Sequence, residues 1–258
     1  MKIGCQTITF GNERHQSDAE GIIKTVASAG YKGVETAFFR IIMNKTETYK
    51  QYLRENNIEQ AAIHVGGNFN DHESVKSQLD NMPHIIKLAH ELECKNIFLS
   101  GSPANFETGC DFAAENINKF GKMISENGLV LSYHNHDWEI KNNYSGLYFL
   151  CDNTDPKYLS FVPDVGWVTR GEGNPVEVLK RLGARVSNLH FKEFTNEGKI
   201  TELGRGIVDF GEVYEFIKTA KTVNDTDMWI IAEQDETSIG AEASVEQNFE
   251  YIKNLVKV

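Results

Sequence analysis

The chain has 258 residues, of which 40% are hydrophobic and 24% are charged, and its formal net charge at pH 7 is −11. This length and composition are sufficient to bury a core without disulfides, and we expect a single domain spanning residues 1–258. The acidic excess excludes most nucleic-acid-binding classes, because phosphate contacts need clustered Lys and Arg. Cations and small polyols remain suitable ligands.

The cysteines and the hydropathy pattern indicate a reducing, aqueous compartment. Cys5, Cys94, Cys110 and Cys151 form no C-x-x-C pair, so no cysteine zinc site is predicted. The first ten residues are too polar for a signal peptide, and no apolar run approaches the ~18 residues of a membrane span. We therefore expect a cytoplasmic protein without a membrane partner. Exposed helices offer surfaces for a homo-oligomer, but nothing in the sequence selects one.

In chain order, eight short runs have the length and residue types of β-strands. They are Lys2–Thr7, Gly33–Ala37, Ile58–Val65, Asn96–Ser100, Val130–Asn135, Leu159–Asp164, Val186–Lys192 and Trp229–Gln234. Helical stretches separate them, and one has Val75, Leu79 and Met82 on a single apolar face. Strict alternation predicts a parallel sheet with helices outside it. Eight such units close an α/β fold, the (β/α)8 TIM barrel.

The alternative architecture is an open, doubly wound sheet. That fold usually binds a nucleotide through a G-x-G-x-x-G turn after its first strand. Here Thr9-Phe10-Gly11-Asn12 follows the first strand, and the chain contains no Walker-type phosphate loop. The pattern therefore favours the barrel.

Three short motifs predict where helices begin. Asn174-Pro175 is typical of an N-cap followed by proline in the first turn. Ser17-x-x-Glu20 and Ser244-x-x-Gln247 have the spacing of capping boxes. We expect a helix to start at each of these positions.

Polar residues gather where the last four strands end, which is where barrel enzymes place their active sites. His134, Asp164, His190 and Glu233 end four consecutive strands. Two imidazoles and two carboxylates suit Mn²⁺, Co²⁺, Zn²⁺ or Fe²⁺ better than Ca²⁺, which prefers oxygen ligands. The sequence predicts a metal site built from these four residues.

Other residues near the strand ends are candidates for substrate contacts. His64 ends the third strand, where it would bind substrate or serve as a satisfied histidine inside the barrel. His136 shares a strand face with His134 if the strand alternates regularly. Trp138 and Trp167 would form an apolar wall against a sugar ring or pack at the rim.

Charged side chains leave two interpretations open. Lys192 shares a face with His190, where its ammonium would stabilise an enediolate oxygen or form an ion pair with Glu233 or Asp164. Arg205, in the long connection Thr195–Phe210, would hold a phosphate or lie in solvent. Glu35, in the second strand, is expected to be structural rather than catalytic.

The motifs at these positions resemble the xylose isomerase-like barrel superfamily of sugar phosphate isomerases and epimerases. The resemblance runs along nearly the whole chain, through Lys2–Thr7, Gly30–Glu35, Tyr133–Glu139, Asp164–Trp167, His190–Lys192, Leu203–Phe210 and Glu233–Asp235. It implies a (β/α)8 barrel with a divalent metal (Mn, Co, Zn, Mg or Fe) at its mouth. Its usual ligands, Glu, Asp, His and Glu, fall on His134, Asp164, His190 and Glu233.

His134 departs from that pattern, because the family expects an acid there. The leading interpretation is a metal-dependent isomerase or epimerase that acts on a sugar derivative through an enediolate, with Glu233, Lys192 and His134 as catalytic groups. Loss of one carboxylate keeps two alternatives open. One is a dehydratase of a keto-inositol or keto-sugar, since inosose dehydratase-like members also have a His-rich end on strand 5. The other is a sugar-binding barrel without turnover.

Overall fold

The computed structural model describes residues 1–101, 110–220 and 228–257. Its main sheet has eight strands in the order β6-β5-β4-β3-β2-β1-β10-β7. They are β1 (Lys2–Gln6), β2 (Gly33–Ala37), β3 (Glu59–Gly67), β4 (Asn96–Gly101), β5 (Val130–His134), β6 (Ser160–Phe161), β7 (Leu189–Phe191) and β10 (Trp229–Ala232). Every strand pair is parallel. All eight expected strands are confirmed, some with shorter ends.

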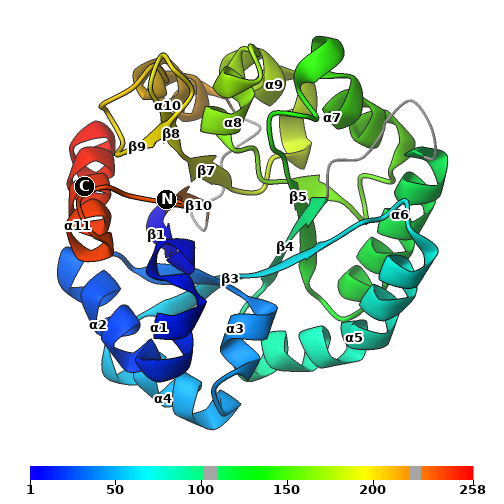
Figure 1. Ribbon diagram of the computed structural model, residues 1–258. Coiled ribbons are helices and arrows are strands. Elements are labelled where there is room, and N and C mark those ends of the chain that lie inside the picture. The colour runs from blue at the N-terminus through cyan, green and yellow to red at the C-terminus, as the bar shows by residue number, and fades with distance from the viewer. Residues whose placement is uncertain (102–109, 221–227, 258) are drawn as a thin grey trace.

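The two ends of this sheet meet and close it. Isolated parallel bridges join Phe161 to Val186 and Asp164 to His190. Backbone hydrogen bonds support this seam, including one of 2.9 Å from the His190 N–H to the Pro163 carbonyl. The structure therefore confirms the (β/α)8 barrel, and Figure 1 shows the helices arranged around the strands.

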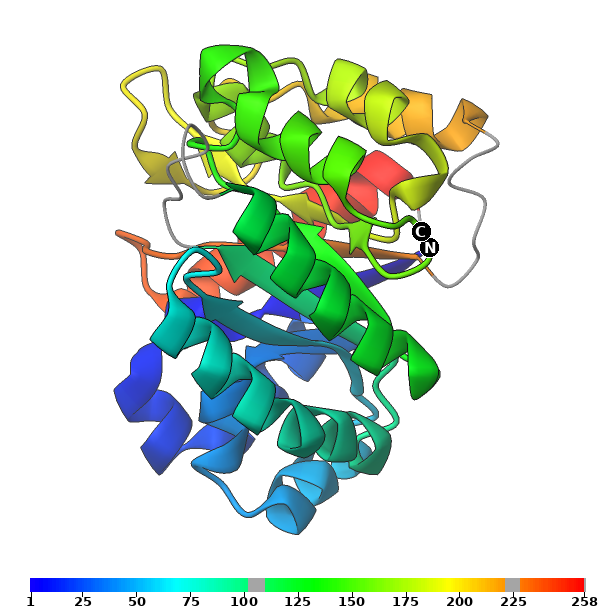
Figure 2. The same ribbon diagram turned by 90° about the vertical axis from the view of Figure 1, so that its right-hand side faces the viewer.

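Helices cover the outside of the barrel, and Figure 2 shows them stacked along the strands from the side. They are α1 (Gly11–Ser17), α2 (Ala19–Ala29), α3 (Phe38–Ile42), α4 (Thr46–Glu55), α5 (His72–Glu91), α6 (Cys110–Glu126), α7 (Lys141–Asn153), α8 (Val165–Arg170), α9 (Pro175–Leu182), α10 (Phe210–Thr219) and α11 (Ala241–Val256). Short 3-10 turns lie at Thr7–Phe10 and Gly183–Arg185. Within the described ranges, none of the helices has both the length and the apolar character to cross a bilayer.

One of the three helix-start predictions is confirmed. The Asn174 side chain accepts a 3.0 Å hydrogen bond from the Glu177 N–H, and α9 begins at Pro175. The prediction at Ser17 is wrong, because α1 ends there and Asp18 caps α2 instead. Ser244 is also not a cap: it lies buried inside α11, which begins after Gly240, a glycine with a φ of 89°.

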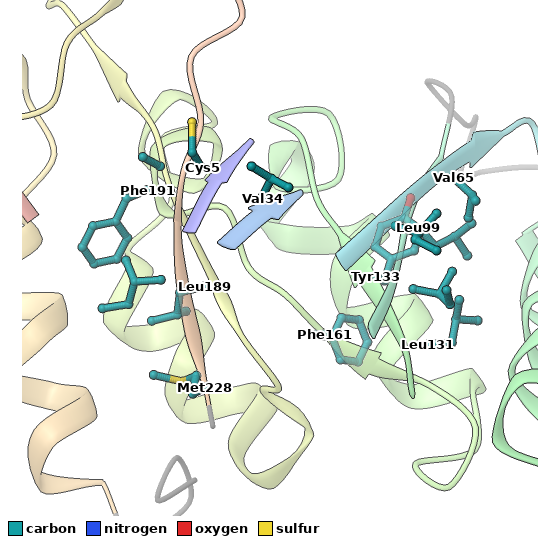
Figure 3. Packing of buried hydrophobic residues seen from close by; sticks show 14 of the residues in the cluster. Cys5, Val34, Val65, Leu99, Leu131, Tyr133, Phe161, Leu189, Phe191 and Met228 are labelled. Carbon is teal, nitrogen blue, oxygen red and sulfur yellow. The ribbon is translucent and has the colours of Figure 1, made fainter. Parts of the chain in front are cut away.

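Two apolar clusters hold the barrel together. The larger one lies between strands and helices, where Leu99, Leu131 and Tyr133 gather near Phe161 (Figure 3). A smaller cluster contains Ala61, Ala62, Phe98, Val162, Trp229 and Ile231. The His190 ring lies edge-on to Phe98, with centroids 5.6 Å apart. This second cluster therefore provides an apolar floor beneath the polar strand ends.

The long connection after β7 has more structure than the sequence indicated. It contains a short antiparallel hairpin, β8 (Glu193–Phe194) with β9 (Ile200–Thr201). The buried Glu193 carboxylate accepts hydrogen bonds from the N–H groups of Phe194, Gly204 and Val208. This one side chain anchors the returning loop to the barrel.

Candidate metal centre and active site

The barrel brings the four expected metal ligands together. His134 ends β5, Asp164 caps α8 just after β6, His190 lies within β7, and Glu233 directly follows β10. One potential ligand atom from each lies within 4.8 Å of the others, and all four side chains are buried. Residues spread over a hundred positions of sequence thus converge on one point.

Glu233 is the centre of this group. Its Oε2 lies 3.1 Å from His134 Nε2 and also contacts His190 Nδ1. His134 Nε2 is in turn 3.6 Å from Asp164 Oδ2. The other Asp164 oxygen accepts a 2.8 Å hydrogen bond from the Trp167 N–H, which fixes the carboxylate at the start of α8. Asp164 therefore presents a single oxygen to the cluster.

The cluster strongly favours positive charge. Burial alone would lower the pKa of His134, but Glu233 and Asp164 outweigh it and raise that pKa to about 10. Burial opposes protonation of His190 too, yet Glu35 and Glu233 raise its pKa to about 9. The surrounding carboxylates thus favour protonation of both buried imidazoles. A bound divalent metal ion would supply the positive charge in place of these protons.

An unpaired oxygen of Asp164 is a second observation that supports a divalent metal at this donor set. Oδ2 of Asp164 is buried and has no hydrogen-bond partner in the part of the chain that the structure describes. A carboxylate oxygen in that position is costly unless it is paired with a proton or a cation. Mixed nitrogen and oxygen ligands suit first-row transition metals.

Glu35 connects this cluster to His64, a histidine outside the four candidate ligands. Its Oε2 lies 2.7 Å from His190 Nε2, and its Oε1 lies 2.6 Å from His64 Nδ1. The other ring nitrogen of His64 is 2.8 Å from the Ser100 hydroxyl. Burial would raise the pKa of Glu35, but His190 and His64 reverse the effect and lower it to about 2. Carboxylates in this position orient metal-binding histidines.

Lys192 is fully buried beside Glu233. Its Nζ lies 2.8 Å from Glu233 Oε1 and 2.7 Å from Asp235 Oδ2, so the ion pair with Glu233 that the sequence left open is present. Burial opposes its charge, but Glu233 and Asp235 raise the pKa of Lys192 above its ordinary value. The ammonium is therefore retained at the cluster.

A cavity of about 420 Å³ opens onto these groups. His64, Ser100, His134, His136, Glu233 and Asp235 form its polar wall, while Ile8, Phe38, Val65 and Ile85 supply apolar surface. Its volume and mixed lining are those of a small-molecule site. Burial, aided by the charge on His134, lowers the pKa of His136 to about 2, so this imidazole faces the cavity uncharged.

Three predicted substrate contacts lie outside the cavity lining. Trp138 stacks on His136 at 4.1 Å between ring centroids, and the Trp167 ring lies 4.6 Å from Lys192 Nζ. Both tryptophans thus pack behind groups that reach the site. The structure does not bring Arg205 to the cavity: it is exposed and bonds to Gln247, because Glu193 holds the returning loop toward α11.

Ser100 and Arg40 line the cavity from the first four strand–helix units, and neither of them was predicted from the sequence pattern. The alternation of β4 offered one usable signal, since Ser100 shares a face with the inward Phe98. For Arg40 there was no periodic signal, because α3 has only five residues.

This architecture, with a polar cluster at the carboxyl ends of eight parallel strands, is that of a (β/α)8-barrel enzyme. The chain belongs to the xylose isomerase-like TIM barrel family, whose model matches residues 23–255. Among curated proteins it is 22% identical to an inosose dehydratase of Bacillus cereus, over 92% of this chain and 90% of that protein. It spans only about half the length of the inosose dehydratases of Bacillus velezensis and Halalkalibacterium halodurans in their alignments, 47% and 45%.

Solved structures share the fold at low identity. A sugar phosphate isomerase/epimerase from Parabacteroides distasonis superimposes with a TM-score of 0.79 at 20% identity, covering 98% of this chain and 93% of that one. The IOLI protein with a bound zinc atom has the same TM-score at 11% identity, covering 100% and 98%. These similarities confirm the (β/α)8 fold.

Proposed function

We propose that this protein binds a divalent metal through His134, Asp164, His190 and Glu233, and removes a proton next to the carbonyl of a sugar-like substrate. The supporting observation is the convergence of these four buried side chains beside a cavity of small-molecule size. A bound metal would supply Lewis acidity that makes hydrogens next to a carbonyl more acidic. The remaining chemistry comes from side chains of this chain.

Glu233 is the proposed base. Burial would raise its pKa, but Lys192 and His134 hold it well below its usual range, which favours the ionised form that a base requires. Lys192 is the proposed acid partner, because its ammonium lies within 2.8 Å of that carboxylate. It would stabilise negative charge on a substrate oxygen or give a proton to a departing hydroxyl.

We favour dehydration as the net reaction. In that reaction a C–H bond is broken by the base, a C–O bond on the neighbouring carbon breaks, and the hydroxyl leaves as water with one added proton. One base and one acid on the same side suffice. The pair Glu233 and Lys192 provides this, and His134 replaces the second acid that an epimerase of this superfamily would use. The B. cereus inosose dehydratase, similar over nearly the whole chain, supports a keto-inositol or keto-sugar substrate.

An isomerase or epimerase is the second candidate, and Asp235 favours it. This carboxylate lines the same cavity, and burial raises its pKa although Lys192 opposes the shift. Asp235 would be a second carboxylate in the cavity, placed to exchange a proton with the substrate after Glu233 has removed another. The solved isomerase/epimerase with the same fold is consistent with this outcome.

Incubation with 2-keto-myo-inositol and a panel of ketoses in D₂O, with Mn²⁺ or Zn²⁺, separates the candidates. A dehydratase yields a product one water lighter, whereas an epimerase yields deuterated epimer of unchanged composition. Failure to bind any divalent metal in the micromolar range would sink the proposal. Tight sugar binding without turnover of any compound would indicate a non-catalytic barrel. Glu233→Gln should abolish turnover. The matched control is Glu59→Gln, because Glu59 pairs with Lys2 at the amino end of β3, away from the cluster.

A further inference from the structure

Arg40 places a positive charge on the cavity wall that the proposed reaction does not use. It lies on α3, which begins directly after β2 and so belongs to the same end of the barrel as the metal ligands. Its side chain lines the cavity together with His64 and Glu233. Only 7% of the residue is exposed, so its guanidinium has little access to bulk water.

The partners of this guanidinium satisfy only part of it. Nε donates a 2.9 Å hydrogen bond to Asn12 Oδ1, and the group lies over the Phe39 ring, 5.3 Å from the centroid. Within residues 1–101, 110–220 and 228–257, no carboxylate forms an ion pair with it. Burial lowers the pKa of Arg40, and no neighbouring acid offsets this.

Other arginines of the described chain contrast with this arrangement. Arg14 pairs with Asp18 and Glu242, Arg170 with Asp137, and Arg181 with Asp152. Arg185 is also partly buried, but it donates to backbone carbonyls, including that of Leu159. Arg40 thus combines burial with a place on the cavity wall, and its terminal N–H groups form no hydrogen bond or ion pair with the described residues.

We propose that Arg40 binds an anionic oxygen group, a carboxylate or a phosphate, on the substrate. A buried guanidinium without a counter-ion is costly, and its planar fork matches two oxygens of one anion. Elsewhere the net charge of −11 and the cavity residues Glu233 and Asp235 repel anions. This inference deepens the proposed function, because it rests on the substrate occupying that cavity.

Neutral donors near Arg40 are consistent with an oxyanion. The amide side chains of Gln6, Gln78 and Asn81 line the same cavity. Gln78 donates to the Gly66 carbonyl, while Gln6 uses its oxygen to accept from the Ile8 N–H, which leaves its amide N–H groups for other acceptors. Amide N–H groups would complete the coordination that a single guanidinium begins.

The test uses isothermal titration of the Mn²⁺-loaded protein with D-glucose, D-glucuronate and D-glucose 6-phosphate. We expect at least one anion to bind about tenfold or more tightly than glucose, as a charge-assisted pair provides. Preference for glucuronate assigns the carboxylate, and preference for the phosphate ester assigns the phosphate. Equal or weaker binding of both anions overturns the inference.

Arg40→Met should remove the anion preference while leaving glucose and Mn²⁺ affinities unchanged. Arg40→Lys, which keeps the charge without the fork, should retain part of the preference and serves if the methionine variant does not fold. Arg54→Met, on the exposed surface of α4, is the matched control. An anion preference that persists in Arg40→Met contradicts the inference. If the wild type does not bind Mn²⁺ but still prefers the anion, only the proposed function is contradicted.

Discussion

Glu35 and His190 face each other inside the barrel, with Glu35 Oε2 and His190 Nε2 2.7 Å apart and both side chains buried. His190 therefore uses one ring nitrogen for Glu35 and turns the other, Nδ1, toward Glu233. A residue from the second strand thus sets the ring orientation of a candidate ligand on β7. Metal-binding histidines commonly depend on such a carboxylate.

Glu35→Gln should weaken divalent-metal affinity by about 10- to 100-fold, because the amide lacks the charge that orients and polarises His190. Competition against a fluorescent chelator measures this affinity directly. Glu59→Gln, which removes an exposed carboxylate at the other end of the barrel, should leave it unchanged. Equal affinities of Glu35→Gln and wild type would show that Glu35 has no part in metal binding.

Metal removal should lower thermal stability. Without a bound metal ion, the carboxylates of the cluster depend on the protons of His134 and His190 for compensating charge. At metal concentrations about 100-fold above Kd, metal binding adds about 2.7 kcal/mol to the free energy of unfolding. Differential scanning calorimetry with EDTA and with Mn²⁺ measures the change in Tm. His134→Ala should abolish most of the metal-dependent rise, whereas His84→Gln, on the exposed side of α5, should keep it. An unchanged rise in His134→Ala would remove His134 from the ligand set.

Lys192→Met should both destabilise the protein and slow turnover. The substitution leaves the buried Glu233 and the partly buried Asp235 without their cation, and loss of one partner of a buried pair costs about 3–5 kcal/mol. Added Mn²⁺ should reduce that loss, because it supplies positive charge at Glu233. Denaturant titrations with and without metal test this coupling, and kcat should fall more than KM rises. A metal-independent loss would assign Lys192 a purely structural role.

Stability should fall on acidification partly through His15. Burial lowers the pKa of this histidine from 6.5 to about 4, and its Nε2 lies 2.9 Å from the Thr7 carbonyl. Below pH 6.5 His15 is protonated in the unfolded chain but remains neutral in the folded protein. The free energy of unfolding therefore decreases as pH falls toward 4. The loss is about 2 kcal/mol at pH 5. His15→Gln should flatten this dependence between pH 7 and 5; His84→Gln should not.

Gly166 makes a steric prediction. A Cβ at this position would lie 2.1 Å from the Lys192 carbonyl oxygen, so the backbone of the first turn of α8 must shift. Gly166→Ala should cost about 1–3 kcal/mol of stability and also weaken metal binding. Gly66→Ala is the control, since its Cβ would meet only ordinary contacts at 3.5 Å and beyond. Unchanged stability of Gly166→Ala would show that the α8 start accommodates the methyl group.

The sequence contained most of the fold and part of the site. Apolar runs revealed all eight strands, and the position of His134, Asp164, His190 and Glu233 at strand ends was enough to predict their convergence. Barrel closure did the rest, since parallel strands bring their carboxyl ends to one mouth.

Contacts between distant strands could not be predicted in the same way. The contacts of Glu35 with two histidines depend on strand register and on rotamers, neither of which leaves a periodic signal. Arg205 was a reasonable anion-binding candidate until the hairpin folded it toward α11. The guanidinium that lines the cavity belongs instead to Arg40, on a helix too short to have a pattern.

The closure of the barrel has a consequence for how it opens. Ordinary strand pairing is replaced at one junction by two isolated bridges, and one of them joins Asp164 to His190. These residues are also candidate ligands of the same ion. An ion bound there would link the two end strands of the sheet, β6 and β7, at the junction that these isolated bridges close. Metal binding and stabilisation of the barrel seam would then be coupled in a single equilibrium. Amide hydrogen exchange at Ser187 and His190 would report on both.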